Sequence, residues 1–310
     1  MKTEQTPLEQ LTAMTEQVGK ERRRSAKPRN PVQKVERFYR VQLESIVRAI
    51  RKEIEQDVVP AVKGEKESYL QDAAYTADGW ADRIIAAIRR VARRYTEGEM
   101  GAAYERLAKR TVSMAEAEST DAFLKSVNEA AGVDMSRMMD QEGINEYVEA
   151  AQYQNAQLIK SVSQDYLSRV ESAVIGGIRD GDAPTTITSR IREATGVSRR
   201  QAQKIARDQT AKLTSEITER RQRSAGIRYY KSITAGDERV TGKPGGKYPN
   251  AKISCWGIAN QDVGYGPGVY RWDVGAEWGG QKGLHAGRHH INCRCSAKPV
   301  FSWEVEGNND

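Results

Sequence analysis

Apolar residues recur every three or four positions through most of the first 225 residues, a spacing that predicts a series of amphipathic helices. The first covers residues 32 to about 62 and is predicted to end near Pro60, because proline disrupts a helix interior. A second helical stretch covers residues 66 to 131, where Gly98 and Gly101 predict an interruption. Both stretches carry one apolar face, as packed helices do.

A third helix is predicted over residues 145 to 178, followed by a turn and a short helix over residues 185 to 194. Gly196 suits the left-handed residue that ends many helices. A capping box then opens a separate helix over residues 198 to 224, which Gly226 is expected to stop. Heptad spacing is not sustained along these segments, so the pattern favours a packed helical bundle over a simple coiled coil.

The pattern changes after residue 227. Thirteen of the 26 glycines fall between Gly236 and Gly287, and apolar residues gather in short groups. These groups predict strands at residues 229 to 234, 268 to 274 and 296 to 303. We therefore expect an α+β protein, with a mainly α-helical N-terminal body and a small, loop- and strand-rich C-terminal domain.

The change from helical periodicity to glycine-rich sequence, together with the basic N-terminus, divides the 310-residue chain into three predicted parts. Residues 1 to 30 form a flexible basic arm, residues 31 to 227 form the helical body, and residues 228 to 310 form a glycine- and tryptophan-rich domain. The length suffices for two domains with cores of their own. The last domain has few aliphatic residues, and small domains of this kind often need a covalent or metal staple.

Positive charge is concentrated near the N-terminus. Residues 20 to 40 hold nine basic groups against two acidic ones, which accounts for the whole net charge of +7. The predicted nucleic-acid-binding residues are Arg22, Arg23, Arg24, Lys27 and Arg29. Such an arm gains affinity for a polyanion by releasing its counterions, and the alternative is a disordered tail that only aids solubility.

Neither a secretory signal nor a membrane span is expected, since the first twenty residues are polar and no apolar run reaches eighteen residues. The chain is therefore predicted to be made in a cytosol. Thiols stay reduced there, so its three cysteines are expected to bind a metal or to remain reduced rather than to form a disulfide framework.

All three cysteines and all three histidines lie between residues 255 and 295. Zinc takes four sulfur or nitrogen donors in a tetrahedron, and closely spaced donors in a turn favour its binding. The predicted metal ligands are Cys255, His290, Cys293 and Cys295. His289 and Asp237 are alternative donors, although we expect His285 and His289 to be bystanders.

Three interpretations of this cluster remain open: a zinc site, reduced structural thiols, and a disulfide that forms after release from the cell. In a regular strand, Cys293 and Cys295 would point to opposite faces of the sheet. Joint ligation by both therefore requires a turn or a bulge at this place.

Catalytic motifs are missing from the sequence, so no enzyme activity is expected. The pair His289-His290 superficially resembles the start of a metal-dependent HNH nuclease site, but only fifteen residues follow Cys295 and none is histidine. The chain also has no phosphate-binding glycine loop and no Gly-x-Ser-x-Gly elbow.

Four blocks of sequence, in this order and at this approximate spacing, resemble the phage head morphogenesis family of Mu F-like minor capsid proteins. They lie at residues 197–210, 226–230, 237–240 and 291–295, and Pro299 follows the last block. The resemblance covers residues 150 to 301. One departure is an inserted loop at residues 241–252, which leaves Cys255 at the position where relatives place histidine or cysteine.

The resemblance implies a minor capsid protein of a tailed bacteriophage. It would associate with the portal and with the major capsid or scaffold protein, support head assembly and DNA packaging or delivery, and contact packaged DNA but no membrane. It would lie in the virion, inside the capsid or at the portal vertex, after assembly in the host cytoplasm. The alternative is a zinc-stabilised DNA-binding protein without a capsid role.

Overall fold

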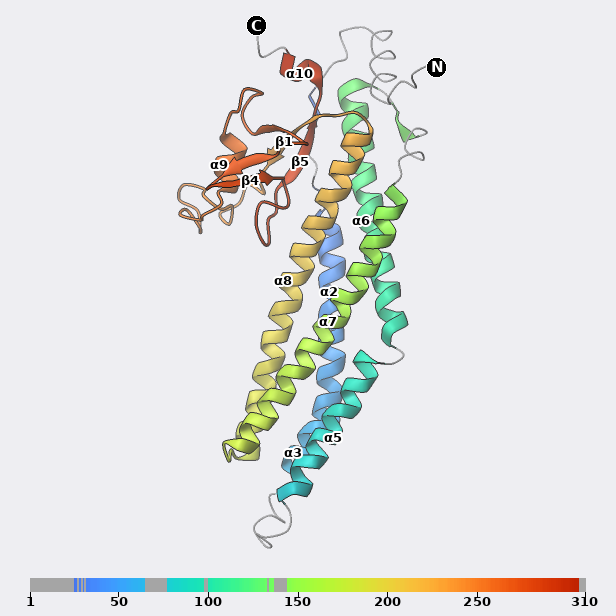
Figure 1. Ribbon diagram of the computed structural model, residues 1–310, viewed down its shortest axis with the longest axis vertical. Coiled ribbons are helices and arrows are strands. Elements are labelled where there is room, and N and C mark those ends of the chain that lie inside the picture. The colour runs from blue at the N-terminus through green and yellow to red at the C-terminus, as the bar shows by residue number, and fades with distance from the viewer. Residues whose placement is uncertain are drawn as a thin grey trace. The chain divides into compact units, whose positions relative to one another are not determined.

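The computed structural model describes residues 25–26, 28, 30, 32–64, 77–97, 100–132, 134–136 and 144–306. Long helices precede a small strand-containing region, which confirms the predicted α+β class (Figure 1). The five predicted nucleic-acid-binding residues of the arm lie outside the described residues. The first two predicted helices are α2 with its continuation to Lys63, and the pair α5 and α6, which are separate helices on either side of residues 98–99.

The helices are α2 (Val32–Glu53), the π-helical turn η2 (Ile54–Val58), α3 (Val59–Lys63), α5 (Ala77–Thr96), α6 (Met100–Ala131), α7 (Ile144–Arg179), α8 (Pro184–Ser224), α9 (Cys255–Asn260) and α10 (Ser302–Glu306). The strands are β1 (Tyr229–Ile233), β2 (Val269–Arg271), β3 (Ala276–Trp278), β4 (Gln281–Leu284) and β5 (Ser296–Val300).

Two compact units share these elements. Unit 1 comprises Met1–Glu36, Ser113–Glu149 and Arg207–Asp310, and unit 2 comprises Arg37–Val112 and Ala150–Ala206. The predicted boundary near residue 227 separates the last long helix from the first strand, but it is not where the compact units divide. Both units instead take parts of α6, α7 and α8.

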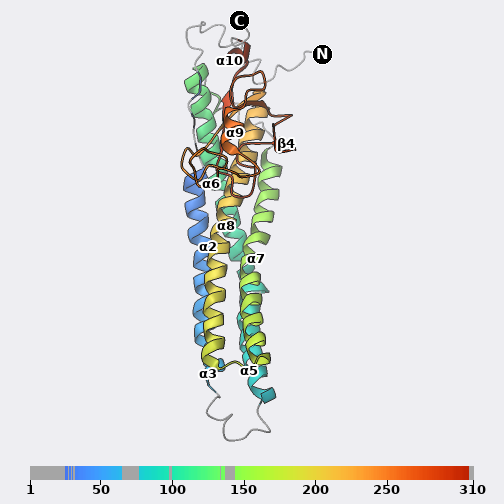
Figure 2. The same cartoon turned by 90° about the vertical axis from the view of Figure 1, so that its left-hand side faces the viewer.

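Unit 2 is a bundle of helical segments that lie side by side in both views (Figures 1 and 2). Its core is built from the apolar faces that the helical period predicts, with Tyr39, Leu43, Ile84 and Ile159 fully or almost fully buried. One buried pair of hydroxyls joins two helices of the bundle: the Tyr104 hydroxyl lies 2.7 Å from Ser163 Oγ.

The predicted extent of the first helix, residues 32 to about 62, is confirmed, because helical structure runs from Val32 to Lys63, although Pro60 itself does not stop it. A π-turn precedes the proline, and the Val59 N–H donates to the Ile54 carbonyl five residues earlier. This wider turn relieves the clash and the missing donor that proline introduces into a regular helix.

The predicted break at Gly196 was wrong, since α8 runs without interruption from Pro184 to Ser224. Ala194, Ser198 and Ala202 are all buried, so the packed face of the helix continues across the glycine. Tertiary packing therefore outweighs the local preference for a helix end at this position.

The predicted end of α8 is confirmed. Gly226 has φ of +81°, the left-handed conformation that glycine adopts without steric cost. The Ile227 N–H donates to the Gln222 carbonyl at 2.8 Å, and the Gly226 N–H donates to the Arg223 carbonyl at 2.9 Å. These two bonds are those of a Schellman motif.

Unit 1 contains an antiparallel sheet with strand order β2-β1-β5 and a separate β3-β4 hairpin. The three predicted strands are present, but the last ends at Val300 because α10 begins at Ser302. Pro299 lies in β5, an edge strand where its missing N–H is tolerated. The hairpin and α9 were not predicted, since their short glycine-rich segments carry no clear period.

Aromatic packing forms the centre of the small domain within unit 1. The rings of Tyr230 and Trp272 stack with centroids 4.0 Å apart. The Trp272 indole N–H donates to Gln222 Oε1 at 3.0 Å, which joins the sheet to the end of α8. The three cysteines belong to the same core, so the thiols pack as part of it.

Among the described helices, none combines the length and the apolar character that crossing a bilayer requires.

Candidate metal centre

Four buried side chains in unit 1 converge on one point: Cys255, His289, Cys293 and Cys295. Their donor atoms all lie within 4.8 Å of one another, and none of the four residues is more than 4% exposed. Three of the four predicted ligands are therefore brought together.

Helix α9 positions Cys255, its first residue. The Ser254 side chain accepts a hydrogen bond from the Gly257 N–H at 2.7 Å and caps the helix. The Cys255 N–H donates to Thr241 Oγ1 at 3.0 Å. Thr241 opens the inserted loop, so that loop helps to hold the isolated cysteine in place.

A turn before β5 supplies the other three donors. The Cys293 N–H donates to the His290 carbonyl at 3.1 Å, and Asn292 has φ of +62°. Because β5 begins only at Ser296, Cys293 and Cys295 are not in a regular strand and both side chains reach the group. The turn that joint ligation requires is present.

The histidine of the group is His289, and the prediction that His290 is the fourth donor and His289 a bystander needs correction. His289 is 2% exposed, and its Nδ1 lies 3.4 Å from Cys255 Sγ. His290 is only partly buried, and its Nδ1 lies 2.8 Å from the Ile291 carbonyl. Spacing alone does not reveal which of two adjacent side chains a turn directs inward.

His290 nonetheless contacts the edge of the group. Its Nε2 lies 3.1 Å from Cys255 Sγ and 3.3 Å from Thr241 Oγ1. With a proton on Nδ1 shared with the Ile291 carbonyl, Nε2 is a hydrogen-bond acceptor for the thiol or the hydroxyl. His290 is thus placed to support Cys255 from outside the four donors.

Two separations within the group are close to those of tetrahedral zinc. Zinc–sulfur bonds of about 2.3 Å at tetrahedral angles place two sulfurs about 3.8 Å apart, and a sulfur and a nitrogen about 3.6 Å apart. The Cys255 and Cys293 sulfurs are 3.8 Å apart, and the His289 Nδ1 distance to Cys255 Sγ is 3.4 Å. A disulfide needs about 2.05 Å between its two sulfurs, so Cys255 and Cys293 are not joined by one.

Hydrogen bonds among the three thiols shift their pKa values in different directions. The thiols of Cys255 and Cys295 hold the pKa of Cys293 well below its ordinary value, because they stabilise its thiolate. The hydrogen bond between Cys255 and Cys293 raises the pKa of Cys255 to about 12. Hydrogen bonds to Cys255 and Cys293 also raise the pKa of Cys295. Cys293 is therefore the most acidic of the three thiols.

Asp237, the alternative donor, is directed elsewhere. Its two carboxylate oxygens each lie 2.6 Å from a nitrogen of the Arg294 guanidinium. The expectation that Asp237 can substitute as a ligand is therefore wrong, because its oxygens are occupied and it lies outside the group of donors.

His285 also lies outside the group, as the sequence predicts. Its ring stacks on Trp272 with centroids 5.6 Å apart, and burial lowers its pKa. A buried Cys₃His group that can bind a metal such as zinc is therefore the outcome for this cluster.

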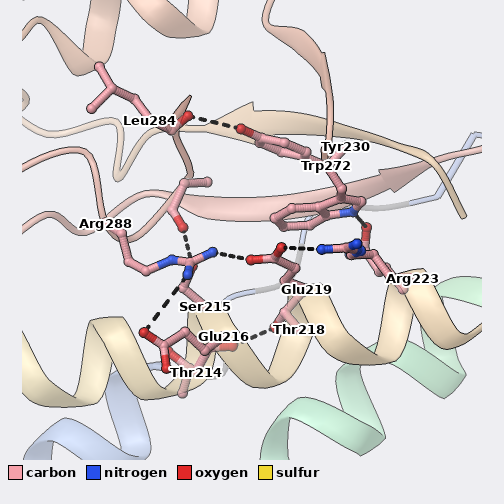
Figure 3. Close-up of polar contacts among 12 residues, drawn as sticks. Thr214, Ser215, Glu216, Thr218, Glu219, Arg223, Tyr230, Trp272, Leu284 and Arg288 are labelled. Atoms are coloured by element: carbon pink, nitrogen blue, oxygen red, sulfur yellow. Dashed lines mark hydrogen bonds and ion pairs between the residues drawn. The ribbon is translucent and has the colours of Figure 1, made fainter. Parts of the chain in front are cut away.

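A polar network beside the cluster ties the cysteine-bearing segment to α8 (Figure 3). The Arg288 guanidinium donates to Ser215 Oγ at 3.1 Å and to Glu219, and Arg223 also pairs with Glu219 at 3.2 Å. Burial alone would raise the pKa of Glu219, but the Arg288 hydrogen bond lowers it below its ordinary value. Sequence reasoning missed this network, because no motif marks either partner.

No protein family matches the chain, and no solved structure matches it. A protein of Haemophilus influenzae described as uncharacterized is 28% identical over 222 residues, which is 71% of this chain and 48% of that protein. The chain thus spans about half the length of this relative.

Proposed function

We propose that the chain is a minor capsid protein of a tailed bacteriophage that associates with the portal or procapsid and supports head assembly and DNA packaging or delivery. One observation carries this proposal: within unit 1, the last of the four sequence blocks contacts Asp208 at the end of the first block and Asp237 of the third, and the second block begins the strand that pairs with β5. Separate blocks with no common structure would weaken the resemblance.

The last block contacts two of the other three. Asn292 binds Asp208 of the first block through its N–H at 2.8 Å. Arg294 pairs with Asp237 of the third block at 2.6 Å. The second block contains Tyr229 and Tyr230 of β1, which pairs with β5 immediately after the last block. Residues 207–210 of the first block and the other three blocks therefore belong to one compact unit, as expected if they are the signature of one protein family.

We propose that the metal of this domain is zinc and that its role is structural. Four protein donors complete a tetrahedral zinc ion and leave no position for a substrate, which is the pattern of structural rather than catalytic sites. The zinc would join α9 to the turn before β5 in a domain that has a small core. No enzyme activity is proposed.

Co-purification tests the capsid role. The full chain is co-expressed with a tailed-phage portal protein from the same genome, and the complex is isolated and analysed by mass spectrometry for both proteins and for zinc. We expect a complex with the portal and about one zinc per chain. A chain that binds zinc but neither the portal nor procapsids would overturn the capsid role while leaving the metal site intact.

The second candidate, a DNA-binding protein without a capsid role, is favoured by the exposed face of α5. Between positions 83 and 94 its exposed or half-exposed basic residues are Arg83, Arg89, Arg90, Arg93 and Arg94. No acidic residue interrupts them, and guanidinium groups recognise phosphate through paired hydrogen bonds. Arg94 pairs with Glu53 at 2.7 Å, and Arg83 also has an interaction within the protein, so Arg89, Arg90 and Arg93 are the phosphate-binding candidates.

A further inference from the structure

Asn292 has a backbone conformation that residues other than glycine seldom adopt. Its φ is +62°, and no other non-glycine residue in the described part of the chain has a positive φ. Asparagine tolerates this conformation better than most residues, but it still prefers others. The turn that contains three of the four metal donors therefore needs an external contact to hold its shape.

Asp208 of α8 provides that contact. The Asn292 N–H donates to Asp208 Oδ1 at 2.8 Å, across a separation of 84 residues. A hydrogen bond to a carboxylate is shorter and stronger than one between neutral groups. The contact lies at the centre of the turn, between His289 and Cys293.

The Asp208 side chain is itself held in one orientation. Its Oδ2 lies 2.6 Å from Lys212 Nζ, one helical turn later, and 3.4 Å from Gln209 Nε2. The side chain is 13% exposed, so water competes weakly for its oxygens. The two carboxylate oxygens thus have different partners, since Oδ2 binds residues of the helix and Oδ1 binds the turn.

We propose that Asp208 is a positioning residue for the metal site. It acts through the Asn292 backbone, fixes the turn with His289 and Cys293 directed inward, and so increases the affinity of the group for zinc and slows zinc release. Asp208 is outside the group of donors and does not bind the metal. This inference rests on the proposed zinc site.

The test measures zinc affinity and zinc release of the full-length protein by competition with a chromogenic chelator. Loss of groups that orient metal ligands typically weakens metal binding 10- to 100-fold, and we expect a loss of roughly this size for Asp208→Ala. Asp208→Asn keeps an oxygen acceptor without the charge, so its loss should be several-fold smaller.

Rescue separates positioning from general damage. Glycine adopts positive φ without steric cost, so Asn292→Gly should restore part of the affinity that Asp208→Ala loses. The effects of the two substitutions are then not additive, as expected for residues that act through one turn. A purely structural role for Asp208 in α8 predicts no rescue.

Asp121→Ala is the matched control. Asp121 forms an i,i+4 ion pair with Lys125 at 2.7 Å on α6, as Asp208 does with Lys212 on α8, but it does not contact the turn. Its zinc affinity should equal that of the wild type. An equal loss in this control would overturn the inference.

The outcomes distinguish this inference from the site on which it rests. A wild-type protein that binds no zinc overturns the metal site itself. A wild-type protein that binds zinc, with Asp208→Ala binding it equally tightly and releasing it equally slowly, overturns the positioning role alone. If Asp208→Ala does not fold, Asp208→Asn decides, since an affinity equal to that of the wild type contradicts the role of the charged carboxylate.

Discussion

Arg294 and Asp237 form a two-point ion pair, in which each carboxylate oxygen lies 2.6 Å from a separate guanidinium nitrogen. Arg294 lies between the two cysteines of the turn, and Asp237 follows the first strand of the sheet. This pair directs Arg294 away from the cysteine thiols and fixes the backbone between them. Lysine cannot reproduce the planar fork, so the contact is specific for arginine.

The pair makes stability depend on pH in acid. The Arg294 guanidinium lowers the pKa of Asp237 to about 2, below the value of about 3.9 for an unfolded aspartate. Its contribution is therefore present above about pH 4 and is lost as pH falls toward 2. Asp237→Asn should lower the free energy of unfolding by at most about 1 kcal/mol at pH 7, because the carboxylate is partly exposed. Urea unfolding at several pH values measures the difference, which should vanish near pH 2.

Asp121→Asn controls for the general effect of removing a carboxylate. Asp121 forms a surface pair with Lys125, and both side chains are 56% exposed. Its replacement should change stability little, because exposed ion pairs contribute little. A difference between wild type and Asp237→Asn that stays constant from pH 7 to pH 2 would contradict the lowered pKa.

The choice between the two adjacent histidines can be tested directly. His289→Ala removes the buried donor and should abolish tight zinc binding, whereas His290→Ala should retain it with a modest loss, since His290 only contacts Cys255 from outside the group. Cobalt substitution gives a second measurement, because tetrahedral cobalt bound to three sulfurs absorbs strongly in the visible range. That spectrum should survive in His290→Ala and disappear in His289→Ala. The opposite assignment would restore the ligand set that spacing alone predicts.

Glycine replacements test the continuity of α8. Gly196 lies inside the helix, and a methyl group added there would lie 3.6 Å from a guanidinium nitrogen of Arg200, which is an ordinary contact. Gly196→Ala should therefore stabilise the protein by about 0.5–1 kcal/mol. Gly226 has φ of +81°, so Gly226→Ala should destabilise it by about 1 kcal/mol. Urea unfolding followed by circular dichroism measures both. Destabilisation by both substitutions would indicate that the helix ends near Gly196 after all.

Local periodicity predicted most of the helical structure because a packed helix repeats its buried face along the sequence. The predictions failed where a distant contact outweighs a local signal. Buried Ala194 and Ser198 continue the packed face of α8 through Gly196. This effect cannot be recognised from the residues immediately around that position.

The candidate site likewise contains residues that local sequence predicted and residues that depend on distant contacts. Residue type and spacing were enough to select the three cysteines, because all three lie in one short stretch and sulfur is a common zinc donor. The histidine was wrongly chosen, because a turn decides which of His289 and His290 points inward. Asp208 contacts that turn at Asn292, which lies 84 positions later in the chain. The Arg288 and Glu219 pair was not predicted for the same reason, since its partners are 69 residues apart.

The arginine face of α5 gives the last prediction. If Arg89, Arg90 and Arg93 bind phosphates, replacing all three by glutamine should weaken binding to double-stranded DNA of random sequence. Each lost phosphate contact lowers the slope of log affinity against log salt by about 0.9, so the triple variant should lose up to about 3 in slope. Fluorescence anisotropy at several salt concentrations measures it. The basic residues 22–24, 27 and 29 are replaced by glutamine in every protein compared, so that the arm does not conceal the effect.

A second triple variant separates this face from net charge. Arg192, Arg200 and Lys204 are exposed on α8, and their replacement by glutamine removes the same charge from a different helix. Long-range attraction depends on total charge and is screened beyond about 10 Å at 0.1 M salt, whereas phosphate contacts depend on position. The α8 variant should therefore keep nearly the full slope. Equal losses of slope in both variants would mean that DNA affinity depends on net charge alone. Binding to an acidic protein but not to DNA would assign the α5 face to a protein partner.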